Sequence, residues 1–192
     1  MKLARGDTIV AFDPGSIIAG YAVLKAKVPG ALLPNDFRII EVGVIKLPKN
    51  KDLSIRIYQL HAAALKIIES YQPKLCALEK AFFGVNPSSA LKLGEARGAL
   101  IAAAGRMQAK IIEVSPTKIK QVITGNRRAS KLEVAMALEA ITGFDRGKLA
   151  YDATDALGLA LAAIISQTVI PSQRNVTWEQ AIRSKDIKPI QE

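Results

Sequence analysis

The chain has 192 residues, a length that fits one domain with a buried core of its own. Hydrophobic residues make up 49% and charged residues 23% of the sequence, which excludes a disordered or fibrous protein. The charge balance is unusual, because 27 Lys and Arg against 17 Asp and Glu give a formal net charge of +10. Such an excess indicates a polyanionic partner, either a nucleic acid or an anionic membrane surface.

Cysteine usage and hydropathy indicate the compartment. Cys76 is the single cysteine and lies in an apolar run, which predicts a buried thiol in a reducing environment. Charged residues come too early at the N-terminus for a signal peptide, and polar residues interrupt the longest uncharged segment, 156–173. We therefore expect a soluble, cytoplasmic protein that does not enter a membrane.

The first half of the chain changes from strand patterns to helix patterns. Apolar, β-branched runs at residues 8–12, 19–25 and 38–47 predict three strands, which hairpin connections make antiparallel. Helical spacing of apolar residues then begins after Asp52, a predicted N-cap. The apolar run 75–79 predicts a strand parallel to the first, because a helix makes the crossover.

The second half is mainly helical. Helices are predicted at 88–107, from Pro116, from the capping box of Ser130 and Glu133 to about 142, and at 151–166, with a strand at 110–114. This order predicts an α/β fold with a mixed five-stranded sheet, three antiparallel strands followed by two parallel ones, flanked by helices. Residues 1–170 are expected to form one domain and 171–192 a polar C-terminal tail.

Two carboxylates stand at the ends of apolar strands. Asp13 ends the first run and Glu79 ends the fourth. If these strands are parallel neighbours, both side chains emerge at the carboxyl edge of the sheet, where open α/β sheets place their sites. Each also has an ordinary explanation, because Asp13 fits a turn and Glu79 fits an ion pair with Lys80 or Arg97.

Asp152 and Asp155 favour the functional interpretation. They lie three residues apart at the start of an apolar helix and therefore share one helix face. Helix dipoles attract acids to such positions, but two like charges on one face repel each other unless a cation lies between them. With no His or Cys cluster in the sequence, four carboxylates favour Mg²⁺ or Mn²⁺, and two such ions can act on one phosphodiester.

The segment 97–131 is strongly basic. It holds eight Lys or Arg and a single acid, Glu113, and its dense end comprises Lys118, Lys120, Arg127, Arg128 and Lys131. A face that is merely solvated usually contains more acidic residues. We therefore expect this dense end to bind phosphates.

Several motifs, in order, resemble the RuvC-type Holliday junction resolvases. They are residues 13–16 (Asp-Pro-Gly-Ser) with Gly20-Tyr21, Leu78-Glu79, the block 86–98, and residues 152–157. The block 89–98 is the most specific of them. The resemblance implies a ribonuclease-H-like fold, a homodimer, paired symmetric nicking of four-way DNA junctions with two Mg²⁺ ions per active site, and a RuvA–RuvB branch-migration complex as partner.

The resemblance also assigns roles to single residues. The metal-binding catalytic acids are Asp13, Glu79, Asp152 and Asp155. Phe82 matches an aromatic residue that meets bases near the opened junction, and Lys120 and Lys131 match basic residues of the DNA surface. The sequence departs from the family at Lys80, where Gln is common, and in a long connection at 27–37.

Three other functions compete with junction cleavage. The four acids would equally serve another ribonuclease-H-like nuclease, acting on RNA or on other branched DNA. A nucleotide-binding kinase or ATPase can also end its first strand in Asp and a glycine turn, but no glycine-rich phosphate loop is present in the sequence. A DNA-binding module without catalysis would leave the four acids unexplained.

Overall fold

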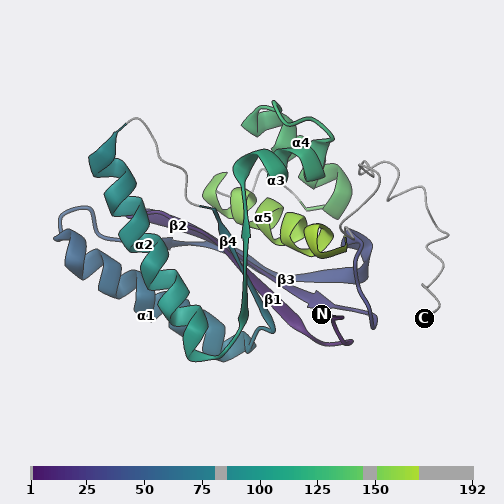
Figure 1. The fold of residues 1–192 in the computed structure, drawn as a ribbon, viewed down its shortest axis with the longest axis horizontal. Helices are drawn as coiled ribbons and strands as arrows, with labels where there is room; N and C mark the ends of the chain where they lie inside the picture. The colour runs from purple at the N-terminus through teal and green to yellow at the C-terminus, as the bar shows by residue number, and fades with distance from the viewer. Residues whose placement is uncertain (1, 81–85, 145–150, 169–192) are drawn as a thin grey trace.

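The computed structural model describes residues 2–80, 86–144 and 151–168 (Figure 1). Five strands in this part of the chain form one sheet in the order β3-β2-β1-β4-β5. The first three strands are antiparallel, and β4 and β5 run parallel to β1. The strands are β1 Thr8–Asp13, β2 Ile18–Ala26, β3 Phe37–Lys46, β4 Leu75–Glu79 and β5 Lys110–Val114. The predicted mixed five-stranded sheet is therefore confirmed.

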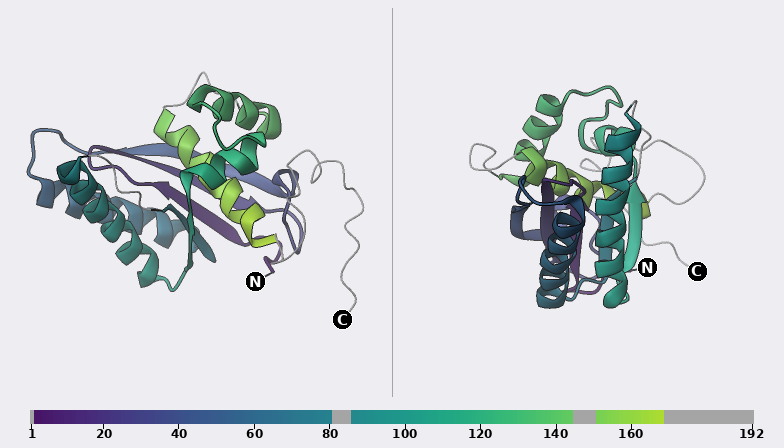
Figure 2. Two further views of the ribbon diagram at one scale, coloured as in Figure 1. Left: turned by 45° about the horizontal axis from the view of Figure 1, so that its top comes forward. Right: turned by 90° about the vertical axis from the view of Figure 1, so that its left-hand side faces the viewer.

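Helices cover both faces of the sheet (Figures 1 and 2). α1 and α2 pack together on one face, α5 crosses the other, and α3 and α4 lie over α5. The long connection between β2 and β3 contains a short 3-10 helix. The α-helices are α1 Leu53–Tyr71, α2 Pro87–Arg106, α3 Pro116–Thr124, α4 Lys131–Thr142 and α5 Tyr151–Thr168, and the 3-10 helix is η1 Pro34–Asp36.

Local capping explains where several helices begin. Ser115 accepts a hydrogen bond from the Lys118 amide, and Ser130 and Glu133 form the predicted capping box of α4. Asn86 caps α2 by accepting from two backbone amides. Asp52 occupies the N-cap position of α1, but its side chain makes no capping hydrogen bond.

Two apolar layers hold the helices to the sheet. Ile9 and Ala11 of β1 face α5, whereas Val10 and Phe12 face α1 and α2, because successive strand residues point to opposite faces. All four are fully buried, so β1 is the centre of the molecule. Cys76 lies in the second layer, where burial raises the pKa of its thiol to about 12, which confirms the predicted buried thiol.

Some predictions fall outside the described residues. Phe82 lies in one undescribed segment and residues 171–192 in another. The division into a domain and a tail therefore stays a prediction. None of the described helices has the length and apolar character needed to cross a membrane.

Candidate active site

Asp13 and Glu79 end neighbouring parallel strands. Phe12 of β1 pairs with Leu78 of β4, so the next residue of each strand is one of the two acids. Both side chains are partly buried, and both line one pocket of about 310 Å³. The predicted meeting of these carboxylates at the carboxyl edge of the sheet is therefore present in the structure.

The turn after Asp13 is stabilised by a contact from α1. Gly15 allows the turn to close, because a Cβ there would lie 1.8 Å from the Ile18 carbonyl oxygen. Arg56 of α1 donates from its guanidinium to the Ser16 carbonyl oxygen at 2.8 Å. Asp13 is thus the last residue of a buried strand and the first of a braced turn, which restricts the position of its carboxylate.

Gly20 brings the start of α5 to the same edge. It lies opposite Asp13 in the β1–β2 ladder, and a Cβ on it would stand 1.8 Å from the Asp152 carbonyl oxygen. Only a residue without a side chain allows this approach of helix to strand. The sequence contained the signal, a glycine inside a strand pattern, but not the identity of the backbone that approaches it.

The four acids form an electrostatic group, here called the acidic edge: Asp13, Glu79, Asp152 and Asp155. Burial, followed by repulsion from the other three carboxylates, raises the pKa of Asp13 to about 7. Burial and the nearby Asp155 also raise the pKa of Glu79. Asp155 lines the pocket with Asp13 and Glu79, whereas Asp152 does not, although its charge reaches Asp13. This grouping of negative charge favours a cation.

Lys131, the first residue of α4, supplies positive charge to this group. Its ammonium Nζ lies 2.9 Å from Asp155 Oδ2, and this hydrogen bond raises the pKa of Lys131. The charge of Lys131 opposes the rise in pKa of both Asp13 and Glu79. Within the described residues, no three His, Cys, Asp or Glu side chains converge tightly enough to hold one metal ion. The four acids lie near one another and Lys131 pairs with one of them, so they do not form an enclosed metal site.

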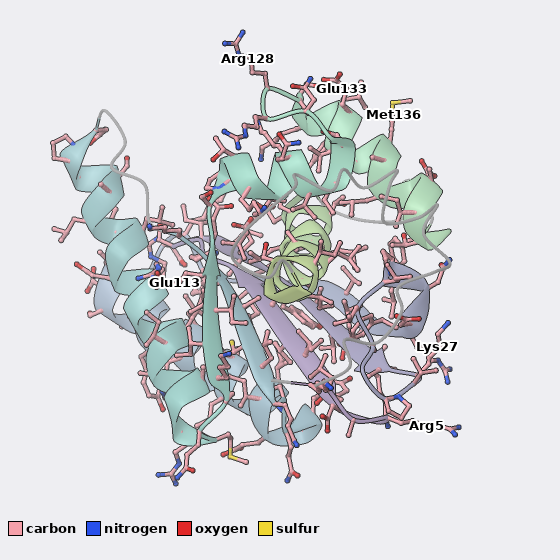
Figure 3. The ribbon with its side chains drawn as sticks, turned by 45° about the vertical axis from the view of Figure 1, so that its right-hand side comes forward. Arg5, Lys27, Glu113, Arg128, Glu133 and Met136 are labelled. Carbon is pink, nitrogen blue, oxygen red and sulfur yellow. The ribbon has the colours of Figure 1, made fainter. Side chains whose placement is uncertain are left out.

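The predicted phosphate-binding residues gather on α3, α4 and the turn between them. This surface, here called the basic shelf, comprises Lys118, Lys120, Arg127, Arg128 and Lys131. Lys120 and Lys131 line the acidic pocket, whereas Lys118, Arg127 and Arg128 are exposed and do not line it, although Lys131 is also largely exposed. Figure 3 shows Arg128 extending away from the turn, beyond the ends of both helices. The shelf therefore has an inner pair at the acids and an outer group in solvent.

Arg97 does not belong to this surface, although it lies in the basic segment. Its guanidinium forms an ion pair with Glu113 of β5, and its Nε donates to the Glu79 carbonyl oxygen at 3.3 Å. The ordinary explanation of Glu79 as an ion-pair partner of Arg97 is thus wrong in one respect. Arg97 holds the backbone of Glu79 and not its carboxylate.

Comparisons with known proteins agree with this geometry. The family model described as "Crossover junction endodeoxyribonuclease RuvC" matches residues 9–163. The chain belongs to the RuvC family. The RuvC of Cytophaga hutchinsonii is 40% identical over 153 residues, covering 80% of this chain and 74% of that protein. The RuvC of Chloroherpeton thalassium is 38% identical over 149 residues, covering 78% and 77%.

Solved structures show the same architecture. Thermus thermophilus RuvC in complex with a Holliday junction substrate superposes with a TM-score of 0.75 and 28% identity, covering 84% of this chain and 94% of that one. The yeast mitochondrial Holliday junction resolvase Ydc2 has a TM-score of 0.58 at 14% identity, covers 86% and 80%, and supports the fold alone. The resemblance drawn from the sequence motifs is therefore confirmed.

Proposed function

We propose that this protein is a metal-dependent endonuclease that resolves four-way DNA junctions by paired symmetric nicks in recombination and repair. The observation that carries the proposal is one pocket lined by three acids of the acidic edge and two lysines of the basic shelf, in a chain that belongs to the RuvC family. The shelf supplies binding sites for phosphates, and the acids supply the place where one phosphodiester is hydrolysed. Family membership favours junction DNA over RNA or another branched DNA as the substrate.

The acidic edge suits Mg²⁺, with Mn²⁺ as an alternative. Carboxylate oxygens are hard ligands, and burial followed by repulsion from the other three carboxylates raises the pKa of Asp13, an effect that a bound cation would oppose. We propose that Asp13, Glu79, Asp152 and Asp155 hold two ions per active site. When bound, such ions polarise the phosphate and lower the pKa of the attacking water. The protein itself contributes a partly buried pocket, charged ligands on rigid elements, and cations at the rim.

The two parts of the basic shelf have different tasks in this scheme. Lys118, Arg127 and Arg128 are exposed and hold the DNA backbone at a distance from the acids. Lys120 and Lys131 line the pocket and meet the phosphates nearest the reacting bond. A metal ion held by Asp155 would replace the ion pair between Asp155 and Lys131, and the Lys131 ammonium would then be available to contact DNA. The predicted contact of Phe82 with a base of the opened junction remains a prediction.

A second copy of the chain is needed for paired nicks, because one acidic edge cuts one strand at a time. We propose that the homodimer forms through the exposed face of α2. This face is lined by Leu91, Gly94, Gly98, Ala102 and Gly105. The three glycines have nothing within 4 Å of an added Cβ, so packing within the described chain does not explain them. Glycine weakens a helix by about 1 kcal/mol relative to alanine, and close approach of a partner helix would compensate for this loss.

The dimer face has a direct test. Gly98→Leu adds bulk where this protomer has open space, so each protomer should fold while the dimer dissociates. Sedimentation should then report monomers, and cleaved junctions should carry single nicks. Gln59→Leu adds the same side chain to the exposed surface of α1 and is the control. A Gly98→Leu protein that remains a dimer would place the contact elsewhere.

Two further parts of the proposal concern the cell. We propose that the protein works in the cytoplasm, and that the RuvA–RuvB branch-migration complex delivers junctions to it. Membership of the RuvC family supports both.

Cleavage of a labelled synthetic four-way junction tests the function. Purified protein with Mg²⁺ should produce two symmetric nicks in opposite strands, whose products can be religated. A linear duplex of the same sequence and an RNA four-way junction serve as controls. Equal cleavage of the linear duplex, or preferential cleavage of the RNA, would exclude a junction-selective DNA enzyme.

A further inference from the structure

One arginine outside the pocket joins three elements behind it. Arg97 of α2 donates from Nε to the Glu79 carbonyl oxygen of β4 at 3.3 Å and pairs with the Glu113 carboxylate of β5. Its side chain is 17% exposed, whereas that of Glu113 is 42% exposed. Figure 3 shows Glu113 beside α2. The partly buried guanidinium of Arg97 therefore links helix α2 to strands β4 and β5.

At its end, β4 is paired with only one of its two neighbouring strands. The β1–β4 ladder stops at the pair Phe12 and Leu78, one residue before Glu79. On the other side, β4 remains joined to β5 as far as Glu79 and Val114. The backbone that carries the metal-binding carboxylate is thus held by the sheet on one side only. The hydrogen bond from Arg97 adds a further support, from the helix layer.

The charge of Arg97 is directed away from the acids. The guanidinium forms its ion pair with the Glu113 carboxylate, and its contact with Glu79 is a hydrogen bond to the backbone carbonyl oxygen. A guanidinium paired with the Glu79 carboxylate would compete with a metal ion for the same oxygens. With Glu113 as its partner, Arg97 fixes the backbone of Glu79 and leaves the carboxylate available.

We propose that Arg97 is a positioning residue for the metal site, acting through the Glu79 backbone, and that Glu113 keeps its charge from the acids. The inference rests on the proposed function, because it takes Glu79 to be a metal ligand. Groups that orient metal ligands from behind typically change metal affinity about 10–100-fold when they are removed. The site should therefore respond to Arg97 without any contact between Arg97 and the ion.

Mn²⁺ binding to the DNA-free protein, followed by electron paramagnetic resonance, tests this directly. Arg97→Met should raise the Mn²⁺ concentration for half-saturation about 10-fold or more. Junction binding in EDTA should stay within about twofold of wild type, since Arg97 is not on the basic shelf. Arg106→Met removes an exposed arginine from the last turn of the same helix and should change neither value.

Glu113→Gln separates the two interactions of Arg97. It releases the guanidinium charge, which then competes at the Glu79 carboxylate, so Mn²⁺ affinity should fall and recover partly at high salt. The double variant with Arg97→Met should bind Mn²⁺ no more weakly than Arg97→Met alone. Additive losses would mean that Glu113 acts by another route.

Separate experiments test whether the Arg97 variants fold and whether the proposed function holds. If Arg97→Met does not fold, Arg97→Lys decides, because it keeps a cation for Glu113 but lacks the planar Nε donor. A folded Arg97→Lys protein should show the same direction of Mn²⁺ change. Wild-type Mn²⁺ affinity in a folded Arg97 variant overturns the inference. Failure of the wild-type protein to cut junctions would overturn the proposed function, whereas the Mn²⁺ comparison does not depend on cleavage.

Discussion

The acidic edge and the basic shelf meet at one pocket, which three of the acids and two of the lysines line, but the two regions are built in different ways. The acids stand at the ends of buried strands and at the start of α5, so packing between distant parts of the chain places them. The shelf stands on two short helices whose ends are fixed by Ser115, Gly125 and Ser130. The arrangement of the acids for cleavage therefore depends on contacts between distant parts of the chain, whereas the arrangement of the basic residues for DNA binding depends on local helix structure. Variants of the two regions should fail differently.

The largest expected effect is loss of cleavage with binding retained. Asp13→Asn, Glu79→Gln, Asp152→Asn and Asp155→Asn each remove a charge that would hold metal, and several kcal/mol of transition-state stabilisation corresponds to about 10³-fold or more in rate. Junction affinity should stay equal or rise, because repulsion of phosphates falls. Single-turnover cleavage and gel-shift titration measure the two quantities. A variant that cuts near the wild-type rate would remove that residue from the proposed site.

Gly20→Ala should give the next largest effect. The added Cβ cannot coexist with the Asp152 carbonyl oxygen at 1.8 Å, so the start of α5 must move away from Asp13. A displacement of about 1 Å at a reacting centre can reduce rate about 100-fold. Single-turnover cleavage should therefore fall by about 10–100-fold, with the basic shelf unaffected and junction binding retained.

Ser54→Ala is the control for this effect. Ser54 is exposed on α1, outside the pocket, the basic shelf and the proposed dimer face, so cleavage should not change and the melting temperature should stay equal or rise. Unchanged cleavage by Gly20→Ala would show that the approach of Asp152 to β2 does not position the acids.

These cases also show what the sequence could predict. Asp13 and Glu79 were predictable because strand ends and parallel crossovers follow from local patterns. The role of Gly20 was not, because it depends on Asp152, at the start of a helix far later in the chain. The ion pair of Lys131 with Asp155 and the hydrogen bond from Arg97 to the Glu79 backbone are likewise long-range interactions. Sequence patterns indicated charges in the right segments but not their partners.

The raised pKa of Asp13 predicts a pH-dependent stability in the absence of metal. Its carboxyl has an ordinary pKa of 3.8 and a pKa of about 7 in the folded protein. Folding therefore favours the protonated form, and the stability this gives is fully present below about pH 4 and is lost as pH rises through 7. Between pH 5 and 8, wild type should lose about 2–3 kcal/mol relative to Asp13→Asn.

Urea unfolding in EDTA at pH 5 and pH 8 measures this difference. Added Mg²⁺ should reduce the loss in wild type, because a bound cation favours the ionised carboxylate, and should do so less in Asp13→Asn. Parallel stability curves for the two proteins in EDTA would mean that burial and the neighbouring carboxylates do not raise the pKa of Asp13 in solution.

The smallest expected effect separates the outer from the inner part of the basic shelf. Replacing Lys118, Arg127 and Arg128 singly by Ala should weaken junction binding and lower the slope of log affinity against log salt by about 0.9 for each phosphate that is no longer neutralised. Cleavage at saturating protein should stay at the wild-type rate, because these residues do not line the pocket. Lys120→Ala should lower both the slope and the saturated rate, since Lys120 lines it. If the outer variants also slow saturated cleavage, then DNA binding and chemistry are not separated in the way that the two regions imply.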